Sequence, residues 1–258
     1  VMETNTHDNI IEVENLVKRY GSFEAVKGIS FSVKRGEIFG LLGPNGAGKS
    51  TTLEIMETLR EKTSGKVRVG GFDLDAHPNK IKEIIGVQLQ SSGYYPGLKL
   101  VELLELFGGL YNRNIDPMAL LAKVNLEDKA KATFKQLSGG QKQRFSIATT
   151  LIHDPQIIFL DEPTTGLDPQ ARRNLWDLIK EIQKKGTTVI LTTHYMDEAE
   201  LLCDRVAIID QGTIIRMATP DQLIDDLLST GFERPKEMKK ANLEDVFIHL
   251  TGHSLREI

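Results

Sequence analysis

The stretch at residues 43–51 constrains the fold of this chain more than any other. It reads Gly-Pro-Asn-Gly-Ala-Gly-Lys-Ser-Thr and fits the phosphate-loop pattern G-x-x-x-x-G-K-[ST]. Residues 37–42, just before it, form a mostly apolar run short enough to be a buried strand. Behind it, Leu53, Met56 and Leu59 recur at helical spacing. Strand, glycine loop and helix in this order predict a phosphate-binding site; the alternative is a Gly-rich turn that matches by chance.

The physical chemistry of this loop explains the prediction. Glycines without a Cβ let the backbone curl until successive N–H groups point at one anion, and the following helix aims its positive end at the same anion. Lys49 adds a point charge for the β- and γ-phosphates, and Ser50 offers a hydroxyl to Mg²⁺. The residues expected to bind nucleotide here are Gly43, Pro44, Asn45, Gly46, Ala47, Gly48, Lys49, Ser50 and Thr51.

The composition is that of an ordinary globular protein, with 258 residues of which 40% are hydrophobic and 26% charged. The net charge of −4 disfavours a surface that neutralises nucleic-acid phosphates, so no nucleic-acid partner is expected. The single cysteine, Cys203, cannot form an internal disulfide and indicates a reducing cytosol. No apolar run approaches the roughly 18 residues of a membrane span, and the polar residues 1–9 do not resemble a signal peptide.

Hydrophobic periodicity predicts an α/β fold. Strands are expected at residues 10–20, 23–33, 37–42, 65–71, 84–90, 156–162, 187–193, 205–210 and 213–217, and helices at 51–59, 99–111, 116–124, 170–185, 196–202, 221–228 and 242–250. The first two strands are joined by a connection too short for a crossover helix, so they are expected to be antiparallel. Residues 91–136 are mainly helical and interrupt the alternation of strands and helices, which predicts an inserted helical subdomain.

Polar residues end two of the expected buried strands. Asp161 suits Mg²⁺ and Glu162 suits a base that polarises an attacking water, the alternative being an Asp-Glu-Pro surface turn. His194 follows the strand at 187–193, and sites assemble at the carboxyl ends of strands in open α/β sheets. A lone histidine in a sequence is more often structural than catalytic. The position of His194 at the end of a strand is the only observation at this point that favours a function.

Two further features are ambiguous when each is considered alone. Ser138 is a credible N-cap, and Gly139 and Gly140 after it form a second helix start that could hold an anion. Tyr20 ends an expected strand, where it is either an ordinary aromatic or a ring that stacks on a base.

Five motifs together resemble the ATP-binding subunits of ABC transporters. They are the phosphate loop, Leu137 to Gln141, the strand ending in Asp161 and Glu162, Gly166 to Asp168, and His194, in the order and spacing of that family over roughly residues 10–217. The expected fold is a P-loop NTPase core with an N-terminal antiparallel β-subdomain and an inserted α-helical subdomain. Residues 10–217 would form the ATPase domain, with 91–136 inserted and the signature helix starting at 138, and 218–258 a C-terminal helical extension.

The resemblance implies roles for individual residues. Tyr20 would stack on adenine, Asp161 would coordinate Mg²⁺, Glu162 would be the catalytic base, and His194 would hold the γ-phosphate and the attacking water. Gln90 would touch Mg²⁺ and the membrane part of the transporter. Gln88 competes for that role, and Gln90 is preferred because it ends the strand. Two more groups would act across a dimer: Ser138, Gly139, Gly140 and Gln141 at a γ-phosphate on another copy, and Asp168 at the seam between copies.

The resemblance also implies partners. ATP and Mg²⁺ would be bound between two copies joined head to tail, and an integral membrane permease would hold the dimer at the cytoplasmic face of the cell membrane. The ending at 242–252, and the absence at 131–136 of a glutamate-bearing stretch found in many fused exporters, favour the drug-resistance-type bacterial exporters with a separate permease. The alternatives are an importer ATPase and a soluble ABC ATPase acting on the ribosome or DNA.

Overall fold

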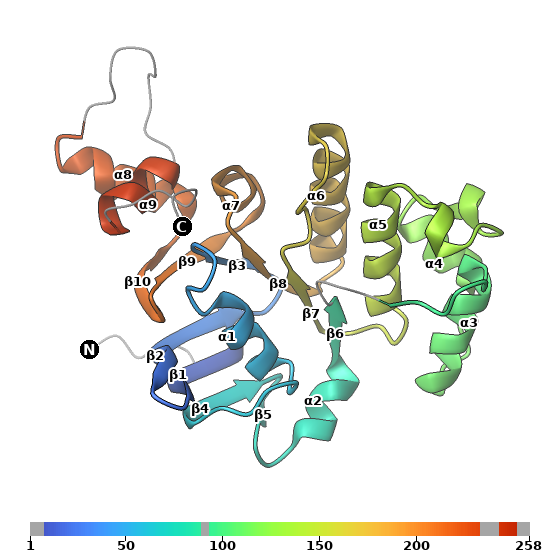
Figure 1. Ribbon diagram of the computed structural model, residues 1–258, viewed down its shortest axis with the longest axis horizontal. Coiled ribbons are helices and arrows are strands. Elements are labelled where there is room, and N and C mark those ends of the chain that lie inside the picture. Colours follow the sequence, from blue (N-terminus) through green and yellow to red (C-terminus); the bar gives the residue numbers. More distant parts are fainter. Residues whose placement is uncertain (1–7, 89–92, 233–242, 252–258) are drawn as a thin grey trace.

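The computed structural model describes residues 8–88, 93–232 and 243–251. Its centre is a sheet with the strand order β10-β9-β3-β8-β7-β6 (Figure 1). All neighbouring pairs in this sheet are parallel except β9 and β10, which form the expected antiparallel hairpin. The strands are β3 (Ile38–Leu42), β6 (Ile85–Gln88), β7 (Ile157–Asp161), β8 (Thr188–Thr193), β9 (Arg205–Asp210) and β10 (Thr213–Ala218).

A second, antiparallel sheet precedes and follows the phosphate loop in the chain. Its strands are β1 (Asn9–Tyr20), β2 (Phe23–Lys34), β4 (Ser64–Val69) and β5 (Phe72–Asp73), in the order β2-β1-β4-β5. The antiparallel pairing of β1 with β2 confirms the prediction made from the short turn between them. The two sheets are brought together around α1, as Figure 1 shows.

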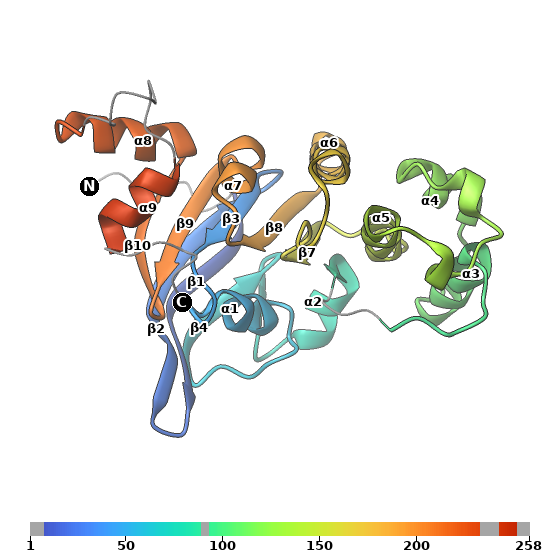
Figure 2. The same ribbon diagram turned by 45° about the horizontal axis from the view of Figure 1, so that its top comes forward.

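Helices surround the central sheet and extend beyond it at both ends. They are α1 (Lys49–Met56), α2 (Pro78–Ile84), α3 (Leu100–Leu110), α4 (Pro117–Lys123), α5 (Gly139–Thr150), α6 (Pro169–Lys184), α7 (Met196–Leu202), α8 (Pro220–Ser229) and α9 (Leu243–Thr251). Figures 1 and 2 both place α3 and α4 at one end of the molecule and α8 and α9 at the other. Every helix in the described part of the chain is too short or too polar to cross a lipid bilayer.

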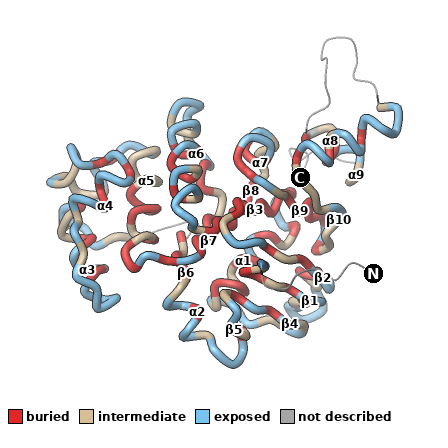
Figure 3. The backbone as a smooth tube through the Cα atoms, turned by 180° about the vertical axis from the view of Figure 1, so that it is seen from behind, coloured by how far each residue is buried: buried red, intermediate tan, exposed pale blue. Residues whose placement is uncertain are grey.

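Two hydrophobic cores lie on opposite faces of the central sheet. Along β7, Ile158 and Leu160 belong to the core under α5, α6 and α7, whereas Phe159 belongs to the core shared with α1 and the antiparallel sheet. This alternation follows from the two-residue period of a strand. Figure 3 shows the buried residues concentrated along the central strands and the helix faces that cover them. Because both faces are covered, the strands are apolar almost without interruption.

The α/β fold and the P-loop NTPase architecture predicted from the sequence are confirmed. Among the α-helices and strands, two are additional: the helix α2, which begins with Pro78 at its first position, and the short strand β5. The proline is the feature from which α2 could have been predicted, since proline is favoured at a helix start. The helix after the phosphate loop also begins earlier than expected, at Lys49.

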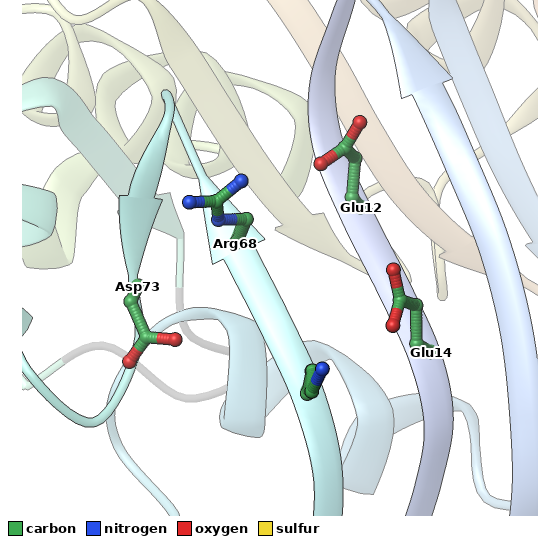
Figure 4. Close-up of a pocket in the computed structure, with 5 residues that line it drawn as sticks. Glu12, Glu14, Arg68 and Asp73 are labelled. Atoms are coloured by element: carbon green, nitrogen blue, oxygen red, sulfur yellow. The ribbon is translucent and has the colours of Figure 1, made fainter. Parts of the chain in front are cut away.

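The outer face of the antiparallel sheet carries a charged hollow of about 370 Å³, remote from the phosphate loop (Figure 4). Arg68 on β4 lies between Glu12 of β1 and Asp73 of β5, and the strand register pairs Glu14 with Lys66. Opposite charges at facing positions of neighbouring strands stabilise the sheet modestly. Asp73 also accepts backbone N–H groups at the turn after β5, which lowers the pKa of its carboxyl. This hollow is therefore explained by the pairing of the strands.

Candidate functional site

The phosphate loop connects β3 to α1 and has two glycines that no other residue could replace without movement. A Cβ on Gly43 would lie 2.1 Å from the carbonyl oxygen of Ile209. Gly48 has a φ of 99°, and a Cβ there would lie 2.6 Å from the carbonyl oxygen of Ala25. The close approach of β9 and β2 to the loop therefore explains the glycines at both positions.

The N-terminus of α1 differs from that of several other helices. Asp116, Ser138, Asp168 and Thr219 each accept backbone N–H groups with their side chains at the starts of α4, α5, α6 and α8. No side chain in the described ranges caps α1 in this way. The first N–H groups of a helix have no acceptor within it and carry a partial positive charge, so this end of α1 suits an anion.

Lys49 opens α1 and is held inside the loop. Its side chain is only 4% exposed, and Nζ donates to the carbonyl oxygens of Gly43 and Pro44, each at 2.9 Å. Nζ also lies 3.7 Å from Oε1 of Glu162. Burial lowers the pKa of Lys49, and the charges of Glu162 and Asp161 oppose that effect. A cation with so little water around it would interact strongly with a phosphate that enters the loop.

Three oxygen-bearing side chains meet at the ends of the neighbouring elements α1, β7 and β8. The hydroxyl of Ser50 donates to Oδ1 of Asp161 at 3.1 Å, and the hydroxyl of Thr192 donates to the same oxygen. The parallel register places Asp161 opposite Thr192. A carboxylate and a hydroxyl beside a phosphate site form the donor set that Mg²⁺ prefers, so these residues fit that ion.

Glu162 follows β7 directly and has a left-handed backbone conformation, with a φ of 48°. Its backbone N–H donates to the hydroxyl of Thr192 at 3.0 Å, which fixes the residue against β8. Its Oε1 lies 3.2 Å from Nδ1 of His194, and the hydroxyl of Thr165 donates to Oε2 at 3.3 Å. The carboxylate is therefore held between Lys49 and His194, where it can accept a proton from a water molecule.

A cavity of about 430 Å³ joins the loop to the tip of the β1–β2 hairpin. Tyr20 lines it with 41% of its surface exposed. Phe23 and Ala25 line it too, and Phe23 is 62% exposed. Neither Phe23 nor Ala25 was predicted from the sequence. The turn at Gly21-Ser22 was the signal for Phe23, because it pairs Phe23 with Tyr20. Two aromatic side chains beside a phosphate loop suit a ligand with a flat base.

The remaining candidate residues lie elsewhere in the described structure. Ser138 caps α5 by accepting from the backbone N–H of Gln141, and the backbone N–H of Ser138 donates to Oε1 of Gln141 at 2.9 Å. Asp168 caps α6 through the N–H of Ala171 at 2.9 Å. Neither the residues from Ser138 to Gln141 nor Asp168 lines the cavity, and α5 lies apart from α1 in Figure 1. Within one chain these groups are therefore not brought together with the phosphate loop.

The two glutamines that competed for the metal-contacting role are treated differently by the structure. Gln90 lies outside the described residues. Gln88 is buried in β6, and its Nε2 donates to Oε1 of Gln143 on α5 at 2.6 Å. The side-chain amide of Gln88 is therefore hydrogen-bonded to α5, the helix that begins at Gly139.

A buried carboxyl behind the site, Glu57, leads to a prediction about pH. Glu57 is 3% exposed, and its Oε1 has no hydrogen-bond partner in the part of the chain that the structure describes. Burial raises its pKa to about 8, and the charges of Asp161 and Glu54 add to the effect. Between pH 4.5 and 8 the unfolded chain loses this proton while the folded chain keeps it. Stability therefore falls as pH rises, by up to about 1.4 kcal/mol per pH unit, and levels off above pH 8.

In Glu57→Gln the new side chain cannot ionise. The free energy of unfolding of this variant should therefore exceed that of the wild type by an amount that grows from pH 5 to pH 8. Urea unfolding at several pH values in the absence of nucleotide measures this difference. Glu61→Gln is the matched control, because Glu61 is exposed and makes the same chemical change away from Glu57. A difference that does not change with pH would show that Glu57 is ionised in the folded protein.

Comparisons with known proteins agree with this geometry. A family model described as ABC transporter matches residues 26–165. The linearmycin resistance ATP-binding protein of Bacillus subtilis is 42% identical over 84% of this chain and 72% of its own length. The Nod factor export ATP-binding protein I of Ralstonia nicotianae is 42% identical over 83% of this chain and 68% of its own length. A solved dimeric ATP-binding cassette in a post-hydrolysis state, bound to ADP and phosphate, is 29% identical with a TM-score of 0.73, covering 81% of this chain and 98% of that one.

The family match covers the phosphate loop and the strand β7 with Asp161 and Glu162 at its end, and it also covers the helix α5, which does not line the cavity. Members of this family bind and hydrolyse ATP, and their cassettes form dimers and associate with membrane permeases. The chain belongs to the ABC transporter family, in which it is an ATP-binding cassette with ATPase activity.

Proposed function

We propose that this chain is the ATP-hydrolysing subunit of an exporter whose permease is a separate polypeptide. The observation that carries the proposal is the cluster of Lys49, Glu162 and His194 at the uncapped N-terminus of α1. A cation for the phosphates, a base and a second polar contact are the groups that ATP hydrolysis needs at the γ-phosphate.

The roles of the residues follow from their positions. Lys49 and backbone N–H groups at the start of α1 would bind the phosphates, and Tyr20 would stack on adenine with Phe23 beside it. Ser50 and Asp161, with Gln90, would hold Mg²⁺, which when bound neutralises charge on the phosphate oxygens.

Glu162 would take a proton from the attacking water. His194, 3.2 Å from it, would orient that water and the γ-phosphate. The reaction would break the bond between the γ-phosphorus and the bridging oxygen, and would leave ADP and phosphate.

The second part of the site would come from another copy. The residues Ser138 to Gln141 lie at the start of α5 and do not line the cavity of their own chain, and Asp168 lies at the start of α6. When two copies meet head to tail, each helix start would complete the phosphate site of the other. ATP would then hold the dimer together, and hydrolysis would loosen it, because the γ-phosphate is the group that both copies contact. The dimeric state of the solved relative bound to ADP and phosphate supports this arrangement.

Export is favoured by the relatives. The printed names of the similar proteins refer to linearmycin resistance and to Nod factor export. We infer that residues 10–217 form the ATPase cassette, with 91–136 as its inserted helical subdomain, and that residues 218–258 extend it. The permease would hold the dimer at the cytoplasmic face of the cell membrane. An importer ATPase remains the second candidate, and the acidic composition counts against a soluble ATPase that acts on the ribosome or DNA.

The test is to purify the tagged chain from detergent-solubilised native membranes and to identify what accompanies it by mass spectrometry. A permease with several membrane spans of exporter type is the expected result. An importer permease with a substrate-binding protein would overturn the direction of transport, and a ribosomal or nucleic-acid partner without any membrane protein would overturn the transport role itself.

The contact between Tyr20 and adenine gives a separate prediction. Tyr20→Ala should raise KM for ATP roughly tenfold with little change in kcat, because a stacked base is worth about 1–3 kcal/mol and is bound equally in the ground and transition states. Tyr20→Phe keeps the ring and should behave like the wild type. Steady-state ATP hydrolysis measures both variants. An unchanged KM in Tyr20→Ala would remove this residue from the base site.

A further inference from the structure

The starts of α6 and α7 are held together beside His194. Arg172, in the first turn of α6, places Cζ of its guanidinium 4.4 Å from the centre of the Tyr195 ring. The same group donates from Nη1 to Oδ2 of Asp197 on α7 at 3.1 Å. The Tyr195 ring lies against the His194 ring, with centroids 4.2 Å apart and planes tilted by 38°. A continuous line of contacts therefore leads from α6 to the imidazole in the site.

The contact of Arg172 with Tyr195 is more sheltered than an ordinary surface contact. The Arg172 side chain is 20% exposed, whereas its partner Asp197 is 54% exposed. Its Nε is buried and has no hydrogen-bond partner among the described residues. A desolvated guanidinium over an aromatic ring is worth more than an exposed one, and the exposed ion pair with Asp197 contributes little. The ring of Tyr195 is therefore a sheltered contact of Arg172, whose charge also acts on the buried carboxyl of Glu198.

Arg172 is also tied to Asp168. Its backbone N–H donates to the carbonyl oxygen of Asp168 at 3.0 Å, and Asp168 caps the same helical turn through Ala171. A shift of the loop that carries Asp168 would therefore move the first turn of α6, including the guanidinium. In the proposed function Asp168 lies at the seam between two copies, so this turn connects the seam to His194.

We propose that Arg172 is a positioning residue for ATP hydrolysis. Through the ring of Tyr195 it holds the imidazole of His194 beside Glu162, and it makes that position depend on how Asp168 is placed against the second copy. The proposal rests on the proposed function, in which His194 acts at the γ-phosphate. It adds to that function a connection, within one chain, between the dimer contact and the catalytic side chains.

Removal of Arg172 should leave the fold intact, because α6 and α7 are joined by a second, buried contact. The indole of Trp176 donates to Oε1 of Glu198 at 3.0 Å, and Leu175 and Ile179 are fully buried. Burial raises the pKa of Glu198, while the hydroxyl of Thr193, the indole, the hydroxyl of Thr164 and the charge of Arg172 oppose that effect. This contact and the apolar packing hold the helix pair without the guanidinium.

The test measures ATP hydrolysis and nucleotide binding by the full chain. Arg172→Met should lower kcat about tenfold, while KM for ATP and the Kd for nucleotide change less than about twofold, because only the placement of a catalytic group is lost. Arg172→Lys, which keeps a charge over the ring, should restore part of kcat. Arg173→Met is the matched control, since Arg173 is the exposed neighbour on the same helix, and it should turn over ATP like the wild type.

A double-mutant cycle tests the path through Tyr195. Tyr195→Leu should lower kcat as much as Arg172→Met, the double variant should lose no more than either single one, and Tyr195→Phe should be near wild type. Unchanged kcat in Arg172→Met, or losses that multiply in the double variant, would overturn the proposal. Should Arg172→Met fail to fold, Tyr195→Leu decides alone, because it removes the ring and leaves Arg172 paired with Asp197.

His194→Ala separates this inference from the function on which it rests. Wild-type turnover in His194→Ala would contradict the proposed function. A large loss in His194→Ala together with normal turnover in Arg172→Met would contradict the positioning role alone.

Discussion

Glu162→Gln is expected to lower ATP turnover by at least about 100-fold, the loss typical of removing a general base, and to leave ATP binding intact. The amide has the size of the carboxylate and can still reach Thr165 and His194, but it cannot accept a proton from water. With ATP bound and not hydrolysed, the γ-phosphate should hold two copies together. Phosphate release measures the turnover, and light scattering with and without ATP measures the dimer.

Two outcomes would contradict different parts of the proposal. If the variant stays monomeric with ATP, the head-to-tail dimer is wrong. If it hydrolyses ATP at the wild-type rate, Glu162 is not the base. Glu181→Gln is the matched control, because Glu181 is exposed on α6 and makes the same chemical change away from the cavity.

Lys49→Ala is expected to lower kcat/KM for ATP by about 100-fold or more, because it removes a preorganised cation from the place where phosphate charge develops. The ammonium is 4% exposed and already lies among the carbonyl oxygens of the loop, so no surface lysine can take its place. Unlike Glu162→Gln, this variant should also fail to form the ATP-dependent dimer, since the nucleotide itself is held poorly.

The control for Lys49→Ala is Lys185→Ala, which removes an exposed lysine that follows α6. Circular dichroism establishes that both variants are folded, and nucleotide titration separates lost binding from lost chemistry. Wild-type turnover in Lys49→Ala would remove this residue from the site.

The sequence allowed most of the fold to be predicted, for a reason that the two cores make clear. Each central strand is a short apolar run between turn residues, and each covering helix has an apolar stripe, as in Leu175, Leu178, Ile179 and Ile182 of α6, all of which are buried. Polar residues at the ends of such strands contribute nothing to an apolar core, and they therefore indicated a role other than packing. This is why Asp161, Glu162 and His194 could be picked out. They lie near one another because β7 and β8 are parallel neighbours whose carboxyl ends meet at the same edge of the sheet.

Other parts of the site depend on contacts that a linear pattern does not contain. Phe23 reads as an ordinary strand residue until the hairpin places it opposite Tyr20. Arg172 reads as one of several basic residues on α6, and only the packing of α7 against that helix brings Tyr195 under its guanidinium. Glu57 reads as a polar helix residue, and its burial depends on how α1 lies on the central sheet.

The backbone of Glu162 has a consequence for attempts to make this protein more robust. A non-glycine residue at a φ of 48° costs roughly 1–2 kcal/mol relative to an unstrained conformation. Glycine at position 162 would relieve that cost, and so would asparagine in part. A screen that selects only for heat resistance or expression would therefore enrich substitutions that remove the side chain needed for hydrolysis. The strand end at β7 is a place where stability and turnover oppose each other, and any stabilised variant should be checked for its residue at 162 first.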